Sequence, residues 1–100
     1  MNEYIEIVRF RLNAGISEED ILAAELHMAA HLSSNYAGYL GRQLLKSEDG
    51  AWTVLLRMAS KEAMQALLTA LKEDRSDAVR NYVRCVNLKE ARIEFYLAVR

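Results

Sequence analysis

Two glutamates occupy positions where an ionised side chain is costly and where it can do acid–base chemistry. Glu25 falls inside the apolar arc of a predicted helix, at ~100° per residue. That arc consists of Ile21, Leu22, Leu26, Met28, Ala29 and Leu32. Burial on an apolar face raises the pKa of an unpaired carboxyl group. A carboxyl group with a raised pKa suits the role of a general base near neutral pH. Glu25 is therefore a catalytic candidate; the alternative is that it lies at the helix edge or pairs with an arginine.

Glu6 is the second catalytic candidate. It belongs to residues 4–12, a segment rich in β-branched and aromatic side chains that is typical of a strand. If its row faces the helices, Glu6 and Glu25 share one pocket, and two carboxyl groups in one pocket resist ionising together. The alternative is that Glu6 lies near a strand end and meets an arginine of the neighbouring strand.

This strand has no plainly polar face. Alternate side chains point to opposite faces of a sheet. One face carries Tyr4, Glu6, Val8, Phe10 and Leu12, and the other carries Ile5, Ile7, Arg9 and Arg11. Both rows are largely apolar, which indicates a central strand covered on both sides. We expect the first row to face a pocket under the helices and the second to face a partner subunit.

The remaining reactive side chains carry weaker signals. His27 and His31 have the i, i+4 spacing of a metal pair, but the helical wheel turns both away from the core, towards solvent or a partner. No metal site is therefore expected. Cys85, the single cysteine, is predicted to be an inert core thiol. Five arginines are predicted to be interface or surface cations rather than anion ligands: Arg9, Arg11, Arg42, Arg57 and Arg92.

Several aromatic and apolar side chains are candidates to hold a flat ligand. We expect Tyr82, Trp52, Met58 and Phe10 to contact it, with Tyr39 and Tyr96 as further aromatic candidates. The alternative for the aromatic residues is plain core or dimer packing.

Composition narrows the class of protein. The 100 residues predict a single domain over 1–100, and 52% hydrophobic with 27% charged residues is typical of a globular protein. A net charge of -1 gives no field to attract nucleic acid or an anionic membrane. No apolar run reaches the ~20 residues of a membrane span, and no signal peptide is recognised, so we expect a cytoplasmic protein.

The elements that must position these residues follow one another with short connections. Ser17 is predicted to cap a helix that ends near residue 33 or 34, and Ser60 a helix whose apolar stripe ends at Leu71. The strands are predicted at residues 4–12, 39–46, 51–58 and 91–99, with a hairpin turn at 47–50. A helical restart at Ser76 stops at Asn87.

The order βαββαβ predicts a ferredoxin-like α+β fold. Right-handed crossovers place both helices on the same face of a four-stranded antiparallel sheet, with the first strand central. The helix-free face then exposes a wide apolar patch, which usually marks an interface. We expect a homodimer that packs sheet against sheet.

The chain resembles the dimeric α+β barrel proteins, specifically those similar to antibiotic biosynthesis monooxygenases. The resemblance covers essentially the whole chain. Its segments are residues 6–12 leading to 15 and 17–19, then 36–42, 49–52 and 55–63. It implies a homodimer with a pocket between helices and sheet in each subunit. The family's members include cofactor-independent oxygenases, haem-degrading enzymes, isomerases and proteins with no known activity.

The resemblance to oxygenases implies a specific chemistry. Their phenol or enol substrate loses a proton, and its anion reduces O2 without metal or flavin. Here Glu25 takes the proton, Tyr82 or Trp52 holds the ring, the substrate is aromatic, quinone-like or polyketide-like, and no cofactor is expected. A non-catalytic ligand-binding or dimerisation module remains the alternative.

One departure argues against the haem-degrading branch. That branch carries a tryptophan near the end of the third strand, a histidine on the second helix and an asparagine on the first strand. The corresponding positions here resemble Met58, the region around Tyr82, and Val8. We therefore do not expect haem chemistry.

Overall fold

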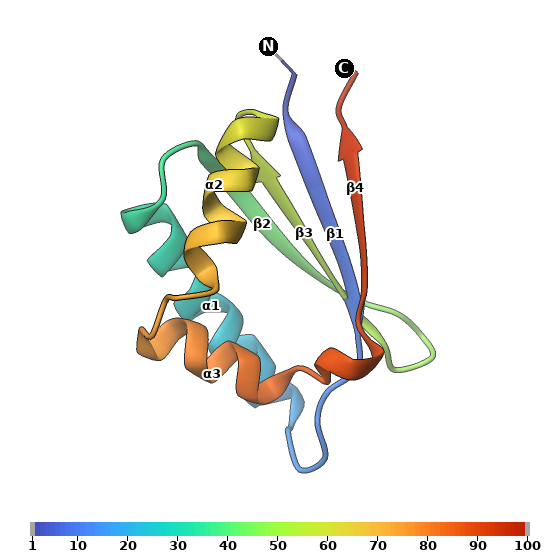
Figure 1. The fold of residues 1–100 in the computed structure, drawn as a ribbon. Coiled ribbons are helices and arrows are strands. Elements are labelled where there is room, and N and C mark those ends of the chain that lie inside the picture. Colours follow the sequence, from blue (N-terminus) through green and yellow to red (C-terminus); the bar gives the residue numbers. More distant parts are fainter. Residues whose placement is uncertain (1, 100) are drawn as a thin grey trace.

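The molecule has two layers, a four-stranded antiparallel sheet and three α-helices that all lie on one face of it (Figure 1). The structure is a computed structural model, and it describes residues 2–99. The elements are β1 (Tyr4–Phe10), α1 (Glu18–Asn35), β2 (Tyr39–Lys46), β3 (Trp52–Met58), α2 (Lys61–Leu71), α3 (Asp77–Cys85), the short 3-10 helix η1 (Leu88–Glu90) and β4 (Arg92–Leu97).

The strand order is β2-β3-β1-β4, which places β1 and β3 in the middle of the sheet. Every neighbouring pair is antiparallel. The predicted ferredoxin-like α+β fold, with a central first strand and helices on one face, is confirmed. In Figure 1 the described ends of the chain lie side by side, because β1 and β4 are neighbours in the sheet.

Two strands are shorter than predicted. β1 ends at Phe10, because Leu12 leaves the sheet and forms an isolated bridge with Val86. β4 ends at Leu97, which pairs with Tyr4 at the first residue of β1, so Val99 has no partner in the β1 ladder.

Serine caps start all three α-helices. The Ser17 hydroxyl accepts from the Asp20 backbone N–H while the Asp20 carboxylate accepts from the Ser17 backbone N–H, a reciprocal capping box for α1. Ser60 accepts from the Ala63 N–H, and Ser76 caps α3 by accepting from the Val79 N–H. These caps fix where each helix begins, as predicted.

The buried face of α1 is narrower than the predicted arc. Leu22 and Leu26 are exposed, the latter by 75%. The buried side chains of α1 are instead Ile21, Ala24, Glu25, Met28 and Leu32. This helix packs mainly against α3 and β2, so only the stripe that meets both becomes covered. The prediction that Leu22 and Leu26 join the core is wrong.

The core lies between β3 and the helices. Trp52, Val54, Leu56 and Met58 are all buried, as their alternation along the strand predicted. Cys85 is fully buried as well, and burial raises the pKa of its thiol. No helix within residues 2–99 has the length and hydrophobicity needed to span a membrane.

Candidate functional site

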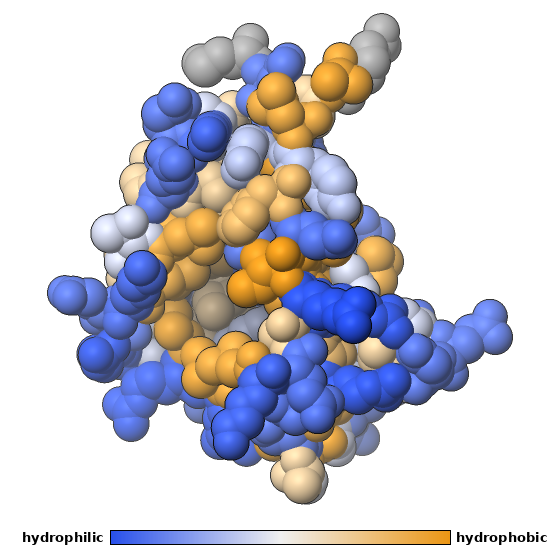
Figure 2. Space-filling model, turned by 45° about the vertical axis from the view of Figure 1, so that its right-hand side comes forward, coloured by the Kyte–Doolittle hydropathy of each residue, from blue (hydrophilic) through white to orange (hydrophobic). Residues whose placement is uncertain are grey.

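A hollow of about 190 Å³ opens between the helix layer and the sheet, beside β1. Its polar lining side chains are Glu6, Arg42 and Tyr82, and the remaining lining side chains are all apolar. Figure 2 shows the hollow with hydrophobic side chains around its mouth. A concave apolar site with a few convergent polar groups is the usual form of a small-molecule pocket.

β1 supplies Glu6, Val8 and Phe10 to this hollow, because these alternate residues face the helices. Glu6 is buried, with 8% of its surface exposed. Burial raises the pKa of the Glu6 carboxyl above its usual value, and the nearby Arg42 guanidinium opposes this effect. The expectation that the row containing Glu6 and Phe10 faces a pocket agrees with this geometry.

Arg42 enters the hollow from β2, and a bulge determines this direction. The register between β2 and β3 shifts between Tyr39 and Gly41, so that Tyr39 lies opposite Met58 and Arg42 lies opposite Leu56. Strict alternation from Tyr39 would point Arg42 to the other face of the sheet. Because of the bulge, the guanidinium lies under the helices.

Arg42 pairs with Glu25 of α1 in a bidentate ion pair. Nε donates to Oε2 at 2.8 Å and Nη2 donates to Oε1 at 2.9 Å. The side chains of Arg42 and Glu25 are only 5% and 11% exposed. Within the described chain, no hydrogen bond engages Nη1 of Arg42. The pairing alternative stated for Glu25 is therefore the one observed, and the prediction of a surface role for Arg42 is wrong.

Tyr82 of α3 closes one side of the hollow. The Arg42 guanidinium carbon lies 5.1 Å from the centre of its ring, a cation–π geometry, and its ring meets Phe10 edge-on. The Tyr82 hydroxyl is buried and has no hydrogen-bond partner among residues 2–99. Burial and the Glu25 carboxylate raise the pKa of this hydroxyl well above its usual range, against the opposing effect of Arg42.

This arrangement suits acid–base chemistry on an apolar molecule. Burial raises the pKa of the Glu6 carboxyl group, which favours a role in proton exchange with a ligand. The Arg42 guanidinium lines the hollow and can stabilise negative charge on a ligand oxygen. The Tyr82 hydroxyl is enclosed beside Glu25 and Arg42.

The other predicted site residues lie elsewhere. Trp52 and Met58 are buried in the core and do not line the hollow, and Glu25 reaches it only through Arg42. Arg42 is the site residue that the sequence analysis did not include. The signal that indicated it was Glu25, since a carboxylate on an apolar helix face requires a buried cation.

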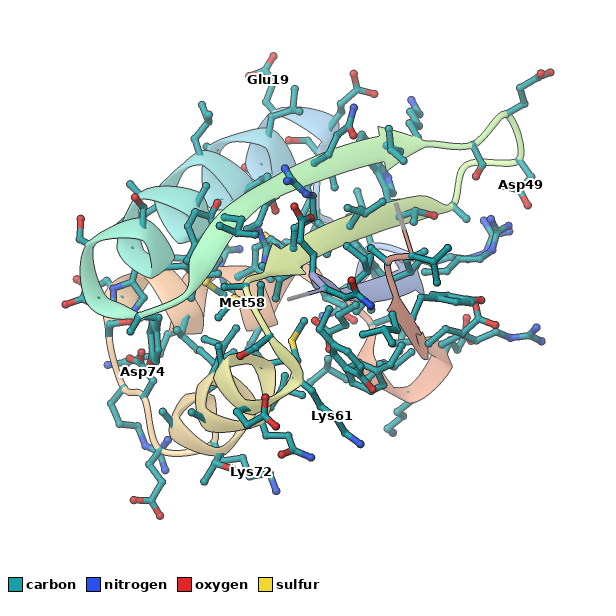
Figure 3. All side chains as sticks on the ribbon, turned by 90° about the horizontal axis from the view of Figure 1, so that it is seen from above. Glu19, Asp49, Met58, Lys61, Lys72 and Asp74 are labelled. Atoms are coloured by element: carbon teal, nitrogen blue, oxygen red, sulfur yellow. The ribbon has the colours of Figure 1, made fainter. Side chains whose placement is uncertain are left out.

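The two histidines separate in the structure. His27 is exposed, as predicted. His31 is only 17% exposed, and its Nε2 lies 2.7 Å from Oδ2 of Asp74 in the connection between α2 and α3. The Tyr36 hydroxyl donates to the same oxygen at 2.6 Å, and Figure 3 shows Asp74 close to the last turn of α1. The prediction that His31 faces solvent or a partner protein is wrong, because Asp74 joins α1 to this connection.

The helix-free face of the sheet is mixed, with an apolar centre and charged side chains around it that include Arg9, Arg57, Arg92 and Glu94. Ile5, Ile7 and Leu55 lie there half-buried, with Leu45 and Tyr96 more exposed around them. Every residue of β4 is exposed, including those that face the helix side. At the hairpin tip, seen at the far end of β2 and β3 in Figure 3, Asp49 pairs with Arg9 and Arg11.

No known protein-family model matches the chain, and no curated protein matches it either. Solved structures do. SnoaB, a cofactor-independent oxygenase from Streptomyces nogalater, superposes with a TM-score of 0.73 at 11% identity, covering 100% of this chain and 96% of that one. A candidate antibiotic biosynthesis monooxygenase from Caulobacter crescentus gives 0.70 at 19% identity, covering 99% and 92%.

A dimeric ferredoxin-like protein from an uncultured marine organism gives a TM-score of 0.65 at 12% identity, covering 100% of this chain and 90% of that one. These similarities concern the fold. The chain has the α+β fold of antibiotic biosynthesis monooxygenase-like proteins and related dimeric α+β barrels. The resemblance stated from the sequence is confirmed at this level.

Proposed function

We propose that this chain binds a small aromatic molecule in the hollow beside β1 and oxygenates it without metal or flavin. One observation carries the proposal: Glu6, a buried carboxyl group with a raised pKa, lines an apolar hollow together with Arg42 and Tyr82. The fold supports it, because SnoaB shares this fold and is a cofactor-independent oxygenase.

The size of the hollow favours a compact substrate. Its volume of about 190 Å³ is smaller than the ~300–1,000 Å³ of pockets for drug-sized ligands. A phenol or enol with one or two rings, or the corresponding quinone as product, suits this volume better than a large polyketide. The apolar lining covers the rings of the substrate, and the polar groups contact the oxygen atom of the substrate.

The reaction begins with proton transfer to Glu6. The substrate anion is held by the Arg42 guanidinium, and it transfers one electron to O2. The two resulting radicals join through a new carbon–oxygen bond, Glu6 returns its proton to the peroxide, and loss of water leaves a carbonyl. One CH2 group and one O2 thus become one C=O group and one water. Glu25 is a positioning residue that fixes Arg42.

The Glu6→Gln variant tests this proposal. With a panel of phenols of one to three fused rings, O2 consumption should fall by roughly 100-fold or more while ligand affinity changes little, because an amide cannot take the proton. Glu3→Gln, directly before β1 and paired with Arg57 outside the hollow, is the matched control and should keep full turnover. If Glu6→Gln turns over normally, Glu6 is not the base.

The second candidate is a non-catalytic binding protein that uses the same hollow. The ion pair favours it, because both carboxylate oxygens of Glu25 are occupied by Arg42 and only Glu6 remains as a base. Binding of the phenols without any O2 consumption would select this candidate. If no phenol binds, both candidates fail.

We also propose that residues 1–100 act as one domain and that two copies pack sheet against sheet. The support is the apolar centre of the helix-free face, where Ile7 and Leu55 lie opposite one another in the β1–β3 ladder. An exposed apolar face of this kind usually marks an interface.

A further inference from the structure

We propose that the ligand is an amphipathic anion, with an aromatic head in the hollow beside β1 and a chain that carries a carboxylate or phosphate into a basic groove between α2 and α3. This inference rests on the proposed function for the head. It adds a second subsite and a chemical class for the rest of the ligand.

The groove adjoins the hollow. It has a volume of about 400 Å³ and lies along the end of α2 and along α3. Leu71 of α2 and Val83 of α3 line both the hollow and the groove. A flexible chain that leaves the hollow over these two side chains would reach the groove.

The groove is apolar along its floor and cationic along its sides. Leu71, Val79 and Val83 provide the apolar surface. The cations that line it are Lys72, Arg75, Arg80 and Arg84. Within residues 2–99 none of these four forms an ion pair, in contrast to Arg9, Arg11, Arg42 and Arg57, which all do.

Among residues 2–99, the acid that lines the groove is Asp74, and it is already engaged. Asp74 accepts from the Tyr36 hydroxyl, lies within hydrogen-bond distance of His31, and also accepts from the Ser76 backbone N–H. These hydrogen bonds hold the pKa of Asp74 well below its usual range. The Asp74 carboxylate is therefore occupied by Tyr36, His31 and Ser76 rather than by the cations of the groove. Those cations are left to bind an anionic ligand.

The spacing on α3 adds a physical reason for an anion. Arg80 and Arg84 are four residues apart, so they are neighbours on one face of the helix, and like charges at this spacing destabilise a helix. A bound anion removes this repulsion. Arg84 also faces Asp20 across a separate hollow, so Arg75 and Arg80 are the cations on which the test depends.

The test uses naphthyl ethers that carry the same flexible alkyl chain and differ only at its end. The ends are carboxylate, phosphate, hydroxyl and ammonium, and affinity is measured by titration calorimetry at low salt. The carboxylate or phosphate ether should bind about tenfold more tightly than the hydroxyl ether, and the ammonium ether more weakly. The tighter of the two anions identifies the tail. Raising the salt concentration should reduce the difference.

Two double variants test whether the cations of the groove cause the difference in affinity. The double variant Arg75→Gln/Arg80→Gln should bind the anionic and hydroxyl ethers equally, while its affinity for the hydroxyl ether stays at the wild-type value. The matched control, Lys61→Gln/Lys89→Gln, removes two exposed cations that do not line the groove and should keep the tenfold difference.

Each outcome has one meaning. If the wild type binds the hydroxyl and anionic ethers equally, the second subsite is overturned and the proposed function of the hollow stands. If the Arg75→Gln/Arg80→Gln variant keeps the tenfold difference, the cations of the groove are not its cause and the proposal fails. If neither ether binds, the proposed function fails, and this inference fails with it.

Discussion

The Arg42 guanidinium donates to both carboxylate oxygens of Glu25, from Nε at 2.8 Å and from Nη2 at 2.9 Å, beneath the helix layer. This pair joins α1 to β2 and fixes Arg42, which in the described part of the chain is the cation that lines the hollow beside β1. The arrangement makes Glu25 important for the position of Arg42 rather than for proton transfer. It also determines how the two residues respond to substitution.

Breaking this pair should be costly, and replacing both partners should not. Glu25→Leu and Arg42→Met should each lower the free energy of unfolding by about 3 kcal/mol, because each leaves an uncompensated buried charge. The double variant should lie within about 1 kcal/mol of the wild type. Urea denaturation of all four proteins measures this cycle. Glu18→Gln, which breaks the exposed pair with Lys46, is the control and should have a much smaller effect. A fully stable Glu25→Leu protein would show that the pair contributes nothing.

Glu6 should reduce stability at neutral pH. Its native pKa is raised above the usual 4.5, so the native state binds more protons than the unfolded state between these two pKa values. Wild-type stability therefore falls as pH rises through that window. Glu6→Gln should be more stable than the wild type by about 1 kcal/mol at about pH 7, and this gain should shrink below the usual pKa. Urea denaturation at several pH values, at one protein concentration, measures it. A gain that does not change with pH would contradict a titrating Glu6.

Gly38 is restricted both by its backbone and by a neighbour. Its φ is +85°, and an added Cβ would lie 2.6 Å from the Cβ of Ala63 at the start of α2. Gly15 has a similar φ of +83° but nothing within 4 Å of an added Cβ, so it is the matched control. Gly15→Ala should lower the free energy of unfolding by about 1 kcal/mol, because alanine is strained in the left-handed backbone conformation. Gly38→Ala should lower it by about 2 kcal/mol more, because its Cβ also clashes with Ala63. Equal losses in thermal or urea unfolding would show that α2 moves away freely.

The sheet-to-sheet dimer can be tested by a charge on the helix-free face. Leu55→Glu should shift the protein to a monomer in sedimentation experiments at micromolar concentration, since it buries a carboxylate in the proposed interface. Leu26→Glu places the same charge on an exposed position of α1 and should leave the assembly unchanged. A wild-type protein that is already monomeric at this concentration would refute the dimer.

The sequence was sufficient for the fold because its local signals agree with one another. Alternation in residues 52–58, the Asp49-Gly50 turn and the serine caps each specify one element, and the order of elements then leaves little choice of topology. The position of Glu6 followed from the same alternation.

What the sequence could not predict depends on contacts between distant segments. The α1 wheel gives a wide apolar arc, but only packing against β2 and α3 decides that Leu26 stays exposed. His31 meets Asp74 across 43 residues of chain, which no local pattern encodes. Arg42 lies under the helices because a bulge changes the register after Tyr39, and alternation alone gives the wrong face.

The position of β1 also constrains how the chain can fold during its synthesis. Of the four described strands β1 is synthesised first, yet one of its two neighbours, β4, is synthesised last. Until β4 emerges, β1 has an open edge of unpaired backbone groups, and the long-range β1–β4 ladder forms late. A nascent chain that stalls after α3 would therefore expose this edge to other chains, and chaperones would have to protect it.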